Sequence, residues 1–136
     1  MGCDGIMIKR ETYLQQIRPF IDQNVIKVLT GIRRCGKSVM LDLIKEELLN
    51  KGVESNQIVS INLESGEWLI KNQVDQLYEY VKARVHQTKK TYLFLDEIQE
   101  MEGWEKAVNA FRIDFDIDIY ITGSNAKLLS GELATY

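Results

Sequence analysis

The chain has 136 residues, 45% of them apolar, and a formal net charge of −3, which suits one folded domain with a substantial core. This charge gives no electrostatic footprint for non-specific binding to nucleic acid, so a role with nucleic acid stays undetermined. No stretch of the sequence could cross a bilayer or act as a secretory signal, so no membrane partner is expected. Two cysteines are too few for a disulfide framework, which favours a location in the reducing cytoplasm.

Predicted helices and strands alternate along the chain. Residues 1–9 are expected to form a flexible tail and residues 10–136 the domain. Apolar periodicity predicts helices over residues 10–18, 37–50, 73–88 and 103–112, with another starting at 127–130. Alternating or continuous apolar runs predict strands over residues 25–30, 58–63, 91–95 and 117–122. This alternation predicts an α/β fold with a mostly parallel sheet and helices on both faces.

Individual residues mark where these helices begin and end. Pro19 disfavours helical backbone at the residue before it, so the first helix is expected to end or bend there. Gly52 is placed to end the second helix. Asn72, with Asp75 three residues later, resembles a capping arrangement that opens the third helix.

The segment that joins the first strand to the second helix has the pattern G-x-x-x-x-G-K-[ST] at residues 31–38, the Walker A phosphate-binding loop of P-loop nucleotide triphosphatases. Glycine at both fixed positions lets the backbone aim successive N–H groups at phosphate oxygens. Lys37, counted among the catalytic residues, is expected to reach the β- and γ-phosphates, and the Ser38 hydroxyl to bind Mg²⁺. The predicted nucleotide-binding residues are Gly31, Ile32, Arg33, Arg34, Cys35, Gly36, Lys37, Ser38 and Val39.

Two acids close the third strand, where the Walker B aspartate of a P-loop protein belongs. Asp96 is expected to hold Mg²⁺ opposite Ser38. Glu97 is expected to orient or deprotonate the attacking water, a role that typically contributes about 10²- to 10⁴-fold to the rate. The alternative is that both acids only begin a polar loop after a buried strand.

The fourth strand ends in Thr122, Gly123, Ser124 and Asn125. A polar side chain here would lie beside the γ-phosphate and could hydrogen-bond the attacking water, the role called sensor 1. Ser124 and Asn125 are the candidates for this catalytic role, with Asn125 favoured because its amide can both donate and accept. The alternative is that both residues cap the helix that follows.

Several other residues carry a structural alternative to a functional role. Arg33 and Arg34 either contact phosphate or a neighbouring subunit, or form a solvated pair. Cys35 lies near a helix N-terminus, where a thiol pKa can fall, but it is also a simple spacer in the loop. Trp68 and Trp104 are expected to be packing residues rather than platforms for base stacking.

The combined motifs resemble the prokaryotic AAA+-like ATPases, within them the group whose P-loop reads T-G-x-R-R-x-G-K-[ST]. The matching segments are residues 29–38, residues 93–99 with Trp104, and residues 121–125. This resemblance implies ATP hydrolysis with Mg²⁺ on a three-layer fold whose parallel sheet has the order 2-3-4-1. It also makes Ile8, Arg10 and Tyr13 candidates for holding the adenine.

The same resemblance implies parts beyond residue 136. Family members continue with a segment that carries an arginine, a fifth strand beside strand one, and usually a C-terminal domain. We therefore expect an N-terminal ATPase fragment whose partners are a nucleotide, the C-terminal domain of the full-length chain and, as a further option, copies of itself. The rival functions are a nucleotide-binding switch or scaffold with negligible hydrolysis and a small-molecule kinase.

Overall fold

The computed structural model describes residues 14–23, 25–29 and 35–123, with the backbone alone for residues 35–39. The predicted tail over residues 1–9 and the predicted helix starting at 127–130 lie outside these residues. Across the described part of the chain, no helix is long and apolar enough to pass through a lipid bilayer.

The centre of the molecule is a sheet of four parallel strands in the order β1-β4-β3-β2. This is the predicted order 2-3-4-1 read from the other edge, so the α/β fold and the strand order are both confirmed. The strands are β1 Lys27–Leu29, β2 Ile58–Asn62, β3 Thr91–Asp96 and β4 Ile117–Thr122. Residues 91–95 are all buried, because helices cover β3 on both faces.

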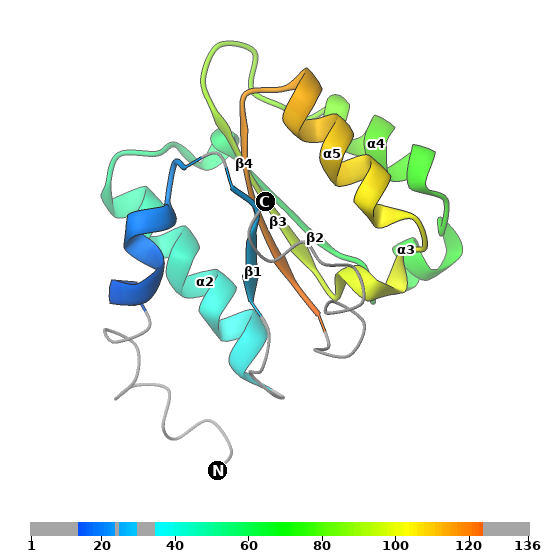
Figure 1. Cartoon of the computed structure of the whole chain (residues 1–136), viewed down its shortest axis with the longest axis horizontal. Helices are drawn as coiled ribbons and strands as arrows, with labels where there is room; N and C mark the ends of the chain where they lie inside the picture. Colours follow the sequence, from blue (N-terminus) through cyan, green and yellow to red (C-terminus); the bar gives the residue numbers. More distant parts are fainter. Residues whose placement is uncertain (1–13, 24, 30–34, 124–136) are drawn as a thin grey trace.

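Helices form a layer on each face of the sheet (Figure 1). The longest, α2, covers one face, and α4 and α5 cover the other. The α-helices are α2 Cys35–Asn50, α3 Gly66–Ile70, α4 Val74–Lys82 and α5 Trp104–Asp114. The short 3₁₀ helices are η1 Arg18–Phe20, η2 Ser55–Gln57 and η3 Ile98–Glu100.

Each face of the sheet has its own apolar core, because successive strand residues point to opposite faces. Leu93, Leu95 and Ile121 pack with the cluster that contains α4 and α5. Phe94 and Tyr120 point the other way, and their rings stack at 4.8 Å between centroids in the cluster that contains α2. Asp96 and Thr122 follow Phe94 and Tyr120 by two residues, so the same alternation places these polar side chains on the α2 face of the sheet.

The second helix ends where the sequence predicts. Gly52 has a φ of +103°, which L side chains rarely adopt. The Gly52 N–H bonds the Leu49 carbonyl at 3.1 Å, and the Val53 N–H bonds the Leu48 carbonyl at 3.0 Å. This pair of bonds is a Schellman motif, which satisfies the last carbonyls of α2.

The first predicted helix changes form at the residue before Pro19, as expected, and its residues 10–13 lie outside the described part of the chain. Residues 14–17 are α-helical, and the 3₁₀ helix η1 follows from Arg18. The Arg18 guanidinium holds this segment against α2 through Glu47, with donor–acceptor distances of 2.8 and 3.1 Å. This contact lowers the pKa of the Glu47 carboxyl, because the hydrogen bond from Arg18 favours its charged form.

The third predicted helix is wrong at both ends. Its N-cap is Gln73 rather than Asn72, and no side chain caps it. It ends at Lys82 instead of continuing to residue 88, because the chain turns back toward β3. The His86 N–H bonds the Thr91 hydroxyl at 2.8 Å, and the His86 ring accepts N–H groups from the following residues. Val85 still packs on the core from this turn, which explains the misleading apolar periodicity.

The remaining differences are smaller. Helix α3 was not predicted, but it buries Trp68 against the core to 4% exposure, and Trp104 is 5% exposed at the start of α5. Both tryptophans are packing residues, as expected. The second helix begins at Cys35 rather than residue 37, and β1 covers only the last part of the predicted strand.

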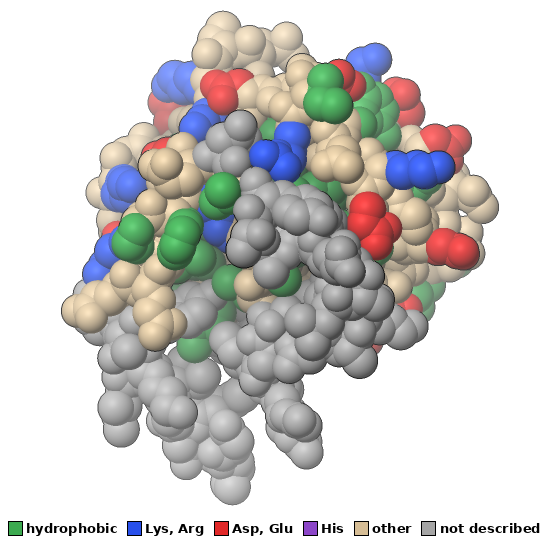
Figure 2. Space-filling model, viewed as in Figure 1, with side chains coloured by type: hydrophobic (Ala, Val, Ile, Leu, Met, Phe, Trp, Pro, Cys, Tyr) green, Lys and Arg blue, Asp and Glu red, His purple; other side chains and the backbone are tan. Residues whose placement is uncertain are grey.

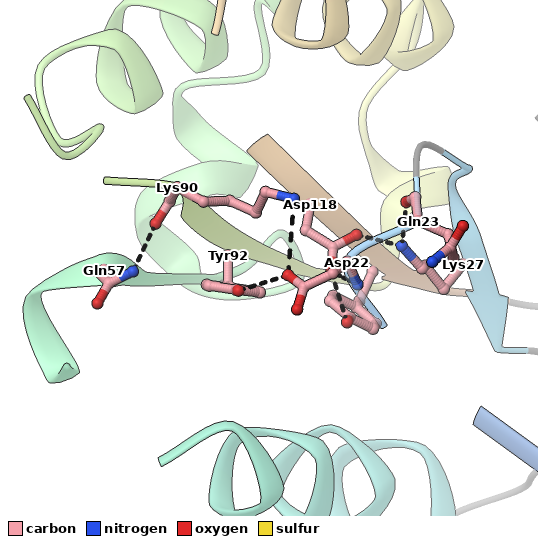
Figure 3. A network of polar contacts seen from close by, with 8 residues as sticks. Asp22, Gln23, Lys27, Gln57, Lys90, Tyr92 and Asp118 are labelled. Atoms are coloured by element: carbon pink, nitrogen blue, oxygen red, sulfur yellow. Dashed lines mark hydrogen bonds and ion pairs between the residues drawn. The ribbon is translucent and has the colours of Figure 1, made fainter. Parts of the chain in front are cut away.

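A buried polar network fixes β1 against β4 on the α2 face of the sheet (Figure 3). The Lys27 ammonium contacts the Asp118 carboxylate, and their side chains are 2% and 1% exposed. Asp118 also accepts the Tyr120 hydroxyl at 2.7 Å and the Asp22 N–H at 3.0 Å. Burial lowers the pKa of Lys27 although Asp118 opposes this, and burial raises the pKa of the Tyr120 hydroxyl.

This network extends to the segment that precedes β1. Asp22 accepts the Tyr92 hydroxyl at 2.5 Å and lies 3.6 Å from the Lys90 ammonium, so it joins β1, β3 and β4 (Figure 3). Lys27 also donates to the Gln23 carbonyl at 2.7 Å. These contacts set the position of β1, and therefore the point at which the chain leaves the sheet toward residues 31–38.

Candidate functional site

All four strands of the sheet end at one level on its carboxyl edge. Leu29 pairs with Thr122, Leu95 pairs with Ile121, and Asn62 pairs with Asp96. Asp96 therefore lies beside Thr122, close to the point where β1 leads toward the predicted phosphate-binding loop. In open parallel sheets, ligands bind outside the carboxyl ends of the strands.

The N-terminus of α2 lies at the same edge of the sheet (Figure 1). This helix has 16 residues and starts at Cys35, so its first turn includes the backbone of Gly36, Lys37 and Ser38. The N-terminus of a helix of this length offers unpaired N–H groups and a partial positive charge to an anion. A polyphosphate held there would face the ends of β3 and β4.

Thr122 connects the two acids that the sequence singled out. Its hydroxyl donates to Asp96 Oδ1 and accepts the Glu97 N–H at 3.1 Å. The Thr122 side chain is completely buried, so these contacts are shielded from solvent. Asp96 and Thr122 are both even-numbered residues of their strands and project toward the α2 face, as Phe94 and Tyr120 do.

Glu97 has an unusual backbone. Its φ of 58° and ψ of 55° are in the left-handed region, which is uncommon for a residue with a Cβ. The Glu97 carboxylate accepts the Gln99 amide at 2.8 Å, and the 3₁₀ helix η3 begins directly after it. Such backbone strain occurs most often at functional sites, and it points to Glu97 as a residue whose direction matters.

The comparison with known proteins agrees with this geometry. Residues 23–136 match the family described as AAA domain. The chain belongs to the AAA domain family. This membership places it, at a coarse level, among the AAA-like P-loop ATPases, whose domains are nucleotide-binding modules.

The relatives of this AAA domain are longer proteins. It is 46% identical over 130 residues to an uncharacterized protein of Haemophilus influenzae, covering 95% of this chain and 32% of that protein. It is 39% identical over 112 residues to the uncharacterized protein MJ1544 of Methanocaldococcus jannaschii, covering 82% of this chain and 24% of that protein. The chain therefore spans about a third and about a quarter of the lengths of these relatives.

The donor atoms at this edge of the AAA domain fit Mg²⁺. Asp96 and Glu97 supply carboxylate oxygens, the hard ligands that Mg²⁺ prefers. No cluster of three or more His, Cys, Asp or Glu side chains suited to a metal exists among the residues that the structure describes. One carboxylate is nevertheless enough, since Mg²⁺ usually takes one or two carboxylates together with phosphate oxygens and water.

Several predicted site residues lie outside the described part of the AAA domain. These are Gly31, Ile32, Arg33, Arg34, Ser124 and Asn125, together with the adenine candidates Ile8, Arg10 and Tyr13. For Cys35, Gly36, Lys37, Ser38 and Val39, the structure places the backbone in the first turns of α2. The roles of all these side chains stay predictions.

The part played by Thr122 was not predicted from the sequence. Thr122 was expected at the end of the fourth strand, but only the two residues after Gly123 were candidates for a functional role. The alternation of side chains along a strand could have indicated this role. Asp96 and Thr122 end neighbouring parallel strands, and their side chains lie on the same face of the sheet.

The charge on the surface is mixed. In the view of Figure 2, basic and acidic side chains are interspersed over the described surface. This distribution agrees with the small net charge of −3. The visible, described part of this face therefore presents no broad basic field of the kind that attracts nucleic acid.

Proposed function

We propose that this AAA domain binds ATP with Mg²⁺ at the carboxyl edge of its sheet and hydrolyses it in the cytoplasm. The observation that carries the proposal is that the α2 N-terminus lies at the same edge of the sheet as the two acids at the end of β3 (Figure 1). The motif over residues 31–38 supplies the sequence pattern for a phosphate loop in the connection between β1 and α2.

The chain's own residues divide the work. The backbone N–H groups of residues 31–38 and the Lys37 ammonium bind the phosphates. Ser38 and Asp96 hold Mg²⁺, which when bound neutralises charge on the phosphates. Glu97 orients the attacking water and accepts its proton, and Ser124 or Asn125 contacts the γ-phosphate. In this proposal Asp96 and Glu97 differ in task because the chain turns sharply between them.

The nucleotide state would be read by other parts of a longer protein. The two relatives are three to four times as long as the matched region, so they carry further segments beside their AAA domains. We propose that ATP binding and hydrolysis change the carboxyl edge of the sheet and that a partner domain, or a second copy of the chain, responds. The domain boundaries proposed for this function are residues 10–136.

The substitution Glu97→Gln tests hydrolysis with little disturbance. A glutamine at this position keeps an oxygen that can accept the Gln99 amide, but it cannot accept a proton from water. We expect the full-length protein to hydrolyse ATP, and Glu97→Gln to lower kcat by about 10²- to 10⁴-fold while ATP binding is kept. Glu100→Gln, the same change at an exposed position in η3, is the matched control and should keep the wild-type rate.

Three outcomes would contradict the proposal. If wild-type protein binds ATP but releases no phosphate, the module is a switch or scaffold. If radiolabelled phosphate moves from ATP to a small molecule rather than to water, the protein is a kinase. A rate unchanged by Glu97→Gln would remove Glu97 from the mechanism.

A further inference from the structure

We propose that Thr122 is a positioning residue that sets the directions of Asp96 and Glu97 through one hydroxyl group. This inference rests on the proposed function, because it assigns work to the acids that the function requires. It adds a residue from β4 that touches neither the nucleotide nor the attacking water in that scheme.

The two contacts use the hydrogen-bonding capacity of the hydroxyl in a defined direction. The single hydroxyl proton is donated to Asp96 Oδ1, so the oxygen lone pairs face the Glu97 N–H at 3.1 Å. A hydroxyl that donates to a carboxylate is also polarised toward stronger acceptance. The contact from Glu97 is therefore strengthened by the contact that the same hydroxyl makes to Asp96.

The second contact supports a strained residue. Glu97 has a φ of 58°, and left-handed backbone is unfavourable for any residue with a Cβ. The turn at Glu97 keeps its N–H directed at Thr122 while its carboxylate is directed at Gln99. Without an acceptor for this N–H, the backbone at Glu97 is free to relax toward a right-handed conformation, which redirects the side chain.

The burial of Thr122 makes the arrangement specific. The side chain is fully enclosed, so water does not replace the hydroxyl when it is lost. Thr122→Val keeps the shape and removes both hydrogen bonds, whereas Thr122→Ser keeps the hydroxyl and removes a methyl group. Thr91→Val is a matched control, because Thr91 is also buried in the sheet and its hydroxyl also accepts a backbone N–H, that of His86 at 2.8 Å.

The first test needs neither nucleotide nor metal. Amide hydrogen exchange measured by NMR on the free protein should show the Glu97 N–H exchanging at least 10-fold faster in Thr122→Val than in the wild type. Thr122→Ser should keep the slow exchange, and Thr91→Val should change the His86 N–H instead. An unchanged Glu97 exchange rate in Thr122→Val would overturn the inference. If Thr122→Val does not fold, Thr122→Ala is compared with Thr122→Ser in the same way.

The second test separates positioning from general destabilisation. The Mg²⁺ concentration that half-saturates binding of a fluorescent ATP analogue is measured in the Glu97→Gln background, where hydrolysis does not interfere. Removing an outer contact to a metal ligand typically costs 10- to 100-fold in metal affinity or activity, so Thr122→Val should raise this midpoint by about that factor. Thr122→Ser should restore it, and Thr91→Val should leave it unchanged.

Failure of the proposed function and failure of the role of Thr122 give different results. If the wild type neither binds nor hydrolyses ATP, the proposed function is wrong and the inference falls with it. If the wild type hydrolyses ATP, Glu97→Gln abolishes turnover, and Thr122→Val keeps both the kcat and the Mg²⁺ midpoint, only the role of Thr122 is wrong.

Discussion

Replacing Lys27 with methionine should destabilise the domain more than any surface substitution. Methionine keeps the length and the apolar stem of lysine but removes the ammonium group that contacts Asp118. The Asp118 carboxylate would then lie buried with two donors left, the Tyr120 hydroxyl at 2.7 Å and the Asp22 N–H at 3.0 Å. These neutral donors do not balance a full buried charge.

The size of the effect follows from the burial of the pair. The two side chains are 2% and 1% exposed, so solvent screening is small. Removing one partner of a buried ion pair typically lowers the free energy of unfolding by about 3–5 kcal/mol. An unfolding entropy near 2.1 cal/mol/K per residue gives about 0.29 kcal/mol/K for 136 residues, so the midpoint of thermal unfolding should fall by about 10–17 °C.

Urea unfolding followed by circular dichroism measures this change, with the double variant Lys27→Met, Asp118→Asn as the control. Asparagine at residue 118 can still accept from Tyr120 and Asp22 but carries no charge. The double variant should therefore recover about 2 kcal/mol or more of the loss caused by Lys27→Met alone. A loss below about 1 kcal/mol for Lys27→Met, or no recovery in the double variant, would refute the reasoning about a buried uncompensated charge.

Two further predictions concern the C-terminal part of α2. Gly52→Ala should lower the free energy of unfolding by about 1–2 kcal/mol, because a residue with a Cβ is strained at a φ of +103° even where no atom lies within 4 Å of that Cβ. Gly66→Ala is the control, since this site is equally open but has no positive φ, and the same urea measurement should show almost no change. Arg18→Gln should cost about 0.5–1 kcal/mol at pH 7, because the partly exposed contact to Glu47 is lost. The pKa of Glu47 is lowered in the folded state, so the difference in unfolding free energy between wild type and Arg18→Gln should be present at pH values above the ordinary glutamate pKa near 4.3. It should vanish as the pH falls through the folded pKa of Glu47. A difference that stays constant from pH 7 to about pH 2 would contradict this prediction.

The strands were predictable because burial leaves a direct trace in the sequence. The residues of β3 are apolar throughout since both faces of that strand are covered, and the strand order followed from the family resemblance. Gly52 was predictable for a local reason, as its backbone conformation excludes most other residues. In contrast, the end of α4 was not predictable from periodicity, because Val85 packs on the core from a turn.

The polar contacts of the site were harder to foresee. Lys27 and Asp118 are 91 positions apart, and nothing in either residue alone marks it as half of a buried pair. Thr122 and Asp96 are 26 positions apart and meet only because their strands are neighbours in the sheet. The sequence motifs predict which residues carry chemistry, whereas the contacts that orient these residues depend on the register of the strands.

The affinity for Mg²⁺-ATP tests the proposed nucleotide site, measured by isothermal titration calorimetry with the wild type, Lys37→Ala and Lys51→Ala. Lys37 lies in the first turn of α2 and Lys51 is an exposed lysine just beyond its last turn, so both variants remove one positive charge near the same helix. We expect the wild type and Lys51→Ala to bind alike and Lys37→Ala to lose most of its affinity. Equal binding by all three proteins would place the nucleotide away from the carboxyl edge of the sheet and contradict the account.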